Sequence, residues 1–274
     1  TALVLAASTI DGDLMLRSGH ASGITDSGTV TVGGDFAAIT DANNGVINMG
    51  TLAVDGIIAL VTNGSGNATV VNDAGLNFAA STVGGNLAAT ATTGNMTDSG
   101  ALTIAGTSSF TTSANNATIA LNTTTNAFTG AVTITTNDDS GTDADVTIDG
   151  GTTALVLAAS TIDGDLTVRS GNASGIADNE GTVTVGGNLA ATTDANNGVI
   201  NLTALAVNGT IAVVTNGAGG ATVVNDAGLN LAASTVGGNL LATATTGNIS
   251  DSGNLTIAGA STFITGASGS NIIL

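Results

Sequence analysis

The stretch Leu76–Gly100, LNFAASTVGGNLAATATTGNMTDSG, decides the fold because the chain contains it twice. It returns at Leu229–Gly253 as LNLAASTVGGNLLATATTGNISDSG, with four differences in 25 residues. Its first part occurs twice more, as LVLAASTIDGDL at Leu3–Leu14 and Leu155–Leu166. Four copies of one short pattern indicate that one local structure is repeated along the chain.

The repetition also holds on a larger scale. Thr1–Leu14 and Thr153–Leu166 are identical, and one extra residue near Glu180 changes the offset between the copies from 152 to 153 residues. This alignment predicts a complete repeat at residues 1–152 and an incomplete second copy at 153–274. Because the N-terminus has no initiator Met and no signal-like segment, we expect the sequence to be a slice of a longer or processed chain.

The composition favours strands and tight turns. The 274 residues include 40 Gly and five Phe, without any Pro, Cys, Trp or Tyr, and only 8% are charged. Val, Ile, Leu and Ala alternate with Thr, Asn, Ser and Gly, which is typical of strands. So few aromatic side chains cannot fill a thick core.

The charge balance excludes several kinds of partner. The net charge is -18, and Arg17 and Arg169 are the only Lys or Arg residues. Such a polyanion is not expected to bind nucleic acid through its phosphates, and no apolar run reaches the roughly 20 residues of a membrane span. The absence of Cys excludes disulfides and thiolate metal sites. Divalent cations remain compatible partners.

Apolar-x-apolar triplets followed by Gly-rich corners recur every 22 to 30 residues. A period of this length made of strands and corners is typical of a β-solenoid. A hairpin meander is the alternative, but it would not require neighbouring strands to share a sequence. We therefore predict an all-β, right-handed parallel β-helix over residues 1–274, with about 11 coils of 22–30 residues.

Three phrases carry a family resemblance: VGGNLAATATTGN at Val83–Asn95, DSGALTIAGTSSFTT at Asp98–Thr112 and NNATIALNTTTNAFTGAVTI at Asn115–Ile134. They resemble the β-strand repeat regions of giant bacterial exoproteins related to filamentous haemagglutinin. The resemblance implies a β-helical shaft of a secreted or surface-attached adhesin or fibre, and hence an extracellular location.

The densest carboxylate cluster comprises Asp138, Asp139, Asp143, Asp145 and Asp149. Ca²⁺ takes oxygen ligands, and Asp143 and Asp145 are spaced to share a strand face. The EF-hand loop and the Gly-rich Ca²⁺-binding nonapeptide are both absent. Two interpretations stay open, a Ca²⁺ site and a solvated acidic turn.

The remaining polar residues suggest structural roles. Arg17 and Arg169 occupy equivalent positions and are expected to bond to nearby Asp side chains or corner carbonyls. His20 is Asn172 in the second copy, so we expect a solvated loop residue. Asn residues recur at the corners and are expected to form ladders by stacking: Asn86, Asn95, Asn188, Asn239 and Asn248.

The function predicted from these features is structural. With one His and no Cys, the sequence offers no convincing nucleophile–base pair or zinc site, so we predict no enzyme and no cofactor other than Ca²⁺. The ends show no polar cap, which predicts end-to-end self-association through terminal coils. The first alternative is a binding module for Ca²⁺-dependent adhesion, carbohydrate or ice. The second alternative is an enzyme that acts on acidic polysaccharide.

Overall fold

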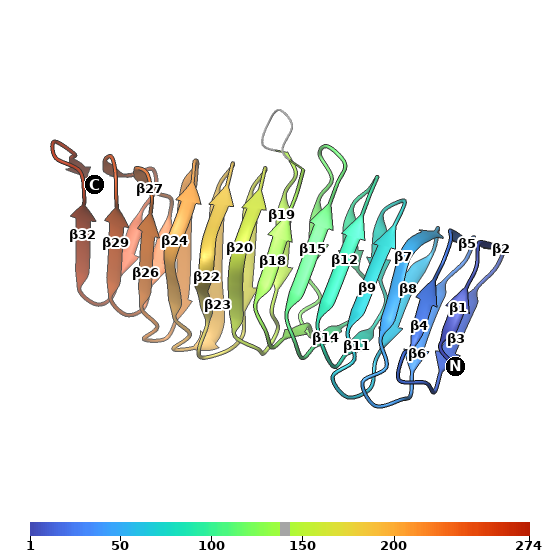
Figure 1. Ribbon diagram of the computed structural model, residues 1–274. Coiled ribbons are helices and arrows are strands. Elements are labelled where there is room, and N and C mark those ends of the chain that lie inside the picture. The colour runs from blue at the N-terminus through green and yellow to red at the C-terminus, as the bar shows by residue number, and fades with distance from the viewer. Residues whose placement is uncertain (138–142) are drawn as a thin grey trace. The chain divides into compact units, whose positions relative to one another are not determined.

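The computed structural model describes residues 1–137 and 143–274, without the side chains of Asn179 and Glu180 (Figure 1). The chain divides into two compact units, Thr1–Asn137 and Asp138–Leu274. The described residues form β-strands joined by turns, with no helix, and therefore none that could cross a membrane. The prediction of an all-β parallel solenoid is confirmed.

The first unit contributes strands to two sheets. Its strands in the first sheet are β1 (Leu3–Leu5), β2 (Ser8–Ile10), β4 (Ile24–Asp26), β5 (Val30–Val32), β7 (Ile47–Val54), β9 (Ala68–Asn72), β12 (Leu87–Ala91), β15 (Ser108–Thr112) and β18 (Val132–Thr135). Its strands in the second sheet are β3 (Leu14–Ser18), β6 (Phe36–Thr40), β8 (Ile57–Val61), β10 (Leu76–Phe78), β11 (Ser81–Val83), β13 (Met96–Asp98), β14 (Leu102–Ile104), β16 (Ile119–Leu121) and β17 (Ala127–Phe128).

The second unit, taken by itself, also forms two sheets. Its strands in the first sheet are β20 (Leu155–Ile162), β22 (Ile176–Val185), β24 (Ile200–Val207), β26 (Ala221–Asn225), β29 (Leu240–Ala244) and β32 (Ser261–Thr265). Its strands in the second sheet are β19 (Val146–Asp149), β21 (Leu166–Ser170), β23 (Leu189–Asn196), β25 (Thr210–Asn216), β27 (Leu229–Leu231), β28 (Ser234–Val236), β30 (Ile249–Asp251), β31 (Leu255–Ile257) and β33 (Ile272–Ile273).

Within each unit, neighbouring strands run parallel and come from successive turns of the chain. In the first unit β12 lies between β9 and β15, and in the second β29 lies between β26 and β32 (Figure 1). Parallel pairing of consecutive turns excludes the hairpin meander for these strands, because a hairpin pairs its strands antiparallel. The extra residue near Glu180 is accommodated by register shifts between β20 and β22.

The turns are shorter than predicted. The register joins Ala68 to Leu87 and Ser108 to Val132, so that a turn takes 19 to 24 residues. The chain therefore contains about 13 turns, where the sequence predicts about 11. The difference arises because apolar triplets occur at more than one place around a turn. The triplet beginning at Val30 pairs with Ser8 on β2, while the one beginning at Leu3 pairs with Ile24 on β4.

Alternating residues of each strand fill a thin core between the two sheets. Buried Val, Ile, Leu and Ala dominate it, and each large aliphatic side chain contributes about 1.5–3 kcal/mol. In the first unit four Phe side chains are fully buried: Phe36, Phe78, Phe110 and Phe128. The last two meet edge to face, with ring centroids 5.8 Å apart.

Two corners require glycine. Gly23 and Gly175 occupy equivalent positions with φ of 69° and 66°, where side chains are strained. A Cβ there would also collide with the carbonyl oxygen of Val46 and Val199, respectively, on the next turn. The close stacking of successive turns thus fixes the residue type at these corners.

The side-chain amides of two buried asparagines bond to backbone groups as a neighbouring strand would. Asn72 Oδ1 accepts the N–H of Val54 at 2.8 Å, while Nδ2 donates to the carbonyls of Val54 and Gly75 at 3.0 and 2.6 Å. Asn225 makes the same three bonds to Val207 and Gly228. Both side chains are 1% exposed. A side-chain amide carries the donor and acceptor of a peptide group, so it continues the pairing where the backbone turns away.

We predict that Asn225→Ala lowers the free energy of unfolding of the second unit by about 1–3 kcal/mol, because it leaves buried backbone groups unpaired. Urea denaturation measures the loss, and faster hydrogen exchange at the Val207 amide locates it. The matched control is Asn48→Ala, which removes an exposed asparagine from β7. Equal stability of the two variants would contradict the assigned role.

Candidate functional site

Side-chain oxygens at the corners bind each turn to the next. Asp13 Oδ1 accepts the N–H of Asp35 at 2.9 Å, and Asp35 Oδ1 accepts that of Ile57 at 3.0 Å. The five corner asparagines named from the sequence do the same for the N–H groups of Thr107, Thr118, Thr210, Ala260 and Asn271. Their structural role is confirmed. The bonds run from backbone N–H to side chain, and thus differ from the expected stack of amides.

A second set of carboxylates clamps pairs of backbone N–H groups. Asp178 is 2% exposed, and its two oxygens accept the N–H groups of Thr203 and Ala204 at 2.7 and 2.8 Å. Asp26, at the equivalent position of the first copy, accepts those of Gly50 and Thr51 at 3.0 and 2.7 Å. These clamps were not predicted from the sequence. Their sequence signal is an Asp two residues after an Ile in both copies, at Ile24–Asp26 and at 176–178.

Both arginines form ion pairs at the surface, as predicted. Arg17 Nε and Nη2 donate to the carboxylate of Asp41 at 2.6 and 3.0 Å. Arg169 makes the same two-bonded contact with Asp194, and its Nε also lies 4.0 Å from Asp149 Oδ2. The hydrogen bond from Arg17 lowers the pKa of Asp41 below its ordinary value. Both cations therefore hold successive turns together.

His20 has a turn-forming role. It is exposed, and its Nδ1 accepts the N–H of Ser22 at 3.1 Å. Asn172, its counterpart, accepts the N–H of Ser174 at 2.8 Å in the same way. The substitution preserves the acceptor, which supports the interpretation of His20 as a loop residue.

The described part of the carboxylate cluster is engaged with the backbone. Asp145 Oδ1 accepts the N–H of Asp165 at 2.8 Å, and Asp149 Oδ1 accepts that of Gly151 at 2.7 Å. Asp143 also has an interaction partner. Among the described residues, no three Asp, Glu, His or Cys side chains gather as a metal site. Asp138 and Asp139 lie outside the described residues, so the Ca²⁺ site stays a prediction.

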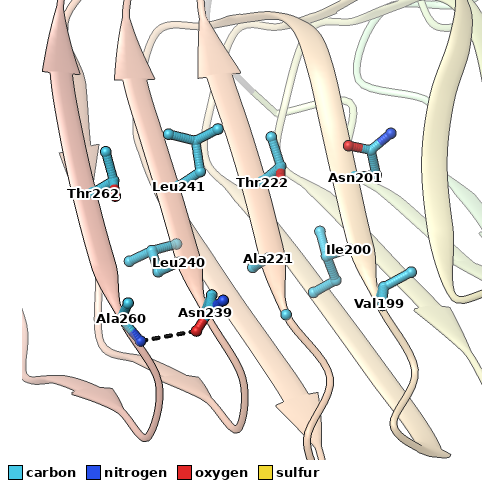
Figure 2. A pocket seen from close by; sticks show the side chains of 11 residues that line it. Val199, Ile200, Asn201, Ala221, Thr222, Asn239, Leu240, Leu241, Ala260 and Thr262 are labelled. Carbon is cyan, nitrogen blue, oxygen red and sulfur yellow. Dashed lines mark hydrogen bonds between the residues drawn. The ribbon is translucent and has the colours of Figure 1, made fainter.

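The second unit carries a lateral groove of about 610 Å³ on its surface (Figure 2). It crosses β24, β26, β29 and β32. One side is a row of corner residues, Val199, Gly220, Asn239 and Ala260, and the other is a row of outward-facing side chains, Asn201, Thr222, Leu241 and Thr262. The floor consists of Ile200, Ala221 and Leu240. In-register pairing brings these segments together.

The groove is neutral and mixed in polarity. Its lining side chains are amides, hydroxyls and aliphatic groups, and none is charged. Val199 is 40% exposed and gives the groove an apolar wall, opposite the amide of Asn201. Asn239 Oδ1 is held by the N–H of Ala260 at 2.9 Å. Such a surface can bind a ligand through hydrogen bonds and apolar contact, but it holds no group that performs acid–base or nucleophilic chemistry.

We predict that Arg17→Gln raises the pKa of Asp41 toward its ordinary value, because it removes the hydrogen bond and the charge that favour the carboxylate. Since the folded pKa is lowered, the stabilisation is present at neutral pH and is lost as the pH falls through that folded pKa. A ¹³C NMR titration of Asp41 measures the change. Arg169→Gln is the matched control and should leave Asp41 unchanged.

The sequence matches a family model described as repeats of unknown function (DUF5649) over residues 1–51, 65–135 and 218–274. No curated protein and no solved structure matches the chain. The resemblance to filamentous-haemagglutinin-related exoproteins therefore stays a prediction. The matched segments lie in both units and make up more than half of the chain, which therefore belongs to this family of repeats of unknown function.

Proposed function

We propose that this chain is a structural, non-catalytic segment of an extracellular fibre or adhesin shaft. The observation that carries the proposal is the bonding between successive turns. Backbone pairing, corner oxygens and buried asparagines all join one turn to the next in both units. Each arginine pairs with an Asp of the next turn, and His20 accepts a bond from Ser22 within its own turn.

End-to-end self-association is part of this proposal. The last strand, β33, exposes Ile272 and Ile273 to 47% and 63%, and Ile264 on β32 is 45% exposed. Where no further turn covers β32 and β33, their parallel edge offers unpaired N–H and C=O groups to another turn of the same kind. A second copy of this chain presents such turns and is the partner proposed.

We expect the 274-residue chain to assemble into thin filaments of constant width as its concentration rises. Electron microscopy and sedimentation velocity test this directly. The double variant Ile272→Lys, Ile273→Lys should remain monomeric with an unchanged circular dichroism spectrum, because it places charges on the apolar edge. The control, Val214→Lys, alters a 37% exposed valine on β25 and should still assemble. A wild-type chain that stays monomeric would refute end-to-end association.

A Ca²⁺ site at the acidic segment is a separate proposal. It rests on the five clustered carboxylates Asp138, Asp139, Asp143, Asp145 and Asp149, of which the last two also accept backbone N–H bonds. If Ca²⁺ binds there, adding it should raise the melting temperature and EDTA should reverse the effect, because a ligand that binds only the folded state stabilises it. The triple variant Asp138→Asn, Asp139→Asn, Asp143→Asn should lose the response. An unchanged melting temperature would remove the site.

A further inference from the structure

The lateral groove coincides with positions at which the two copies differ. Its counterpart in the first unit differs at four lining positions, with Asn67 for Gly220, Ala88 for Leu241, Thr107 for Ala260 and Ser109 for Thr262. The other lining residues are the same, including Val46 for Val199 and Asn86 for Asn239. The same fold thus carries two versions of one surface. Comparing them shows how each substitution changes the hydrogen bonds and the polarity of the groove.

The change at Gly220 removes a rung of the corner ladder. In the first unit, Asn67 Oδ1 accepts the N–H of Asn86 at 2.8 Å. Gly220 has no side chain and cannot make this bond to the N–H of Asn239. In the second unit the N–H of Asn239 therefore has no side-chain acceptor at the groove. The space that an amide side chain fills in the first unit is also open. Leu241 meanwhile adds apolar surface to the outward-facing row.

The groove suits a neutral saccharide better than an anion or a peptide strand. Its lining has no cationic side chain, and the chain's net charge of -18 repels anionic polymers. A peptide strand adds to a sheet edge, whereas this groove lies on a face where β26 and β29 are already paired on both sides. Amides, hydroxyls and a free N–H match sugar hydroxyls, and Val199 and Leu241 match the C–H face of a sugar ring.

We propose that the lateral groove binds a short segment of a neutral polysaccharide. Its volume of about 610 Å³ falls within the range of known ligand sites, roughly 300–1,000 Å³. The absence of an aromatic platform makes the site weak, with a dissociation constant on the order of 1 mM. This role is independent of the proposed structural function, because one lateral surface of a shaft can carry it.

The test is a ¹H–¹⁵N NMR titration of the full chain, in the non-assembling Ile272→Lys, Ile273→Lys form, with maltotetraose and with cellotetraose. We expect saturable shifts at Gly220, Thr222 and Asn239 with one of these neutral probes, and none with a heparin-derived tetrasaccharide. No saturable shift with either neutral probe, or shifts with the anionic one alone, would overturn the proposal.

Exchange of residues between the copies provides matched variants. Gly220→Asn with Leu241→Ala installs the first unit's residues at these two positions, leaves Ala260 and Thr262 unchanged, and should weaken binding at least about tenfold without lowering the melting temperature. The reciprocal pair, Asn67→Gly with Ala88→Leu, should create a second site and raise the stoichiometry from one to two. Unchanged binding in the first variant would overturn the assignment to this groove, whatever the state of self-association.

Discussion

The structure depends on in-register parallel stacking, which places each residue beside the same position of the next turn. Asn86 illustrates the consequence, since it accepts a bond from one neighbouring turn through its side chain and donates its own N–H to Asn67 of the other. A polar side chain at a corner therefore satisfies a backbone group of the neighbouring turn. Stability grows by nearest-neighbour increments, so no single turn needs a thick core.

Much of this could be predicted from the sequence because stacking repeats the sequence. The copies of LxΦ and VGGN indicate which segments are equivalent, and the Gly-rich corners indicate where the chain bends. The spacing of the apolar triplets gave a wrong number of turns. Triplets at Leu3 and Val30 look alike because both alternate inward and outward, but they lie at different places around the turn. Periodicity reports which residues are buried, and only the register shows which strands are neighbours.

The polar positions were harder to predict because their partners are distant in the sequence. Asp178 bonds to backbone groups 25 and 26 residues away, and Asn225 to a group 18 residues away. Neither bond leaves a motif, since the partner is a main-chain N–H that any residue supplies. The ion pair of Arg17 was accessible to prediction because scarce cations in an acidic chain must find carboxylates. The groove was not, because its lining comes from four successive turns that are distant in the sequence.

Because the repeat is present in two copies, one copy can change a surface residue while the stacking of the turns is retained. Loss of the rung at Gly220 affects the bond between two turns, while the backbone pairing of Ala221 with Leu240 is unchanged. The equivalent rung at Asn67 is retained in the other copy, so the architecture itself does not require Gly at this corner. Gly220 is also not held at a positive φ, in contrast to Gly175, whose corner excludes any side chain. The backbone conformation therefore does not fix the residue type at position 220, and contacts made by the surface can decide it.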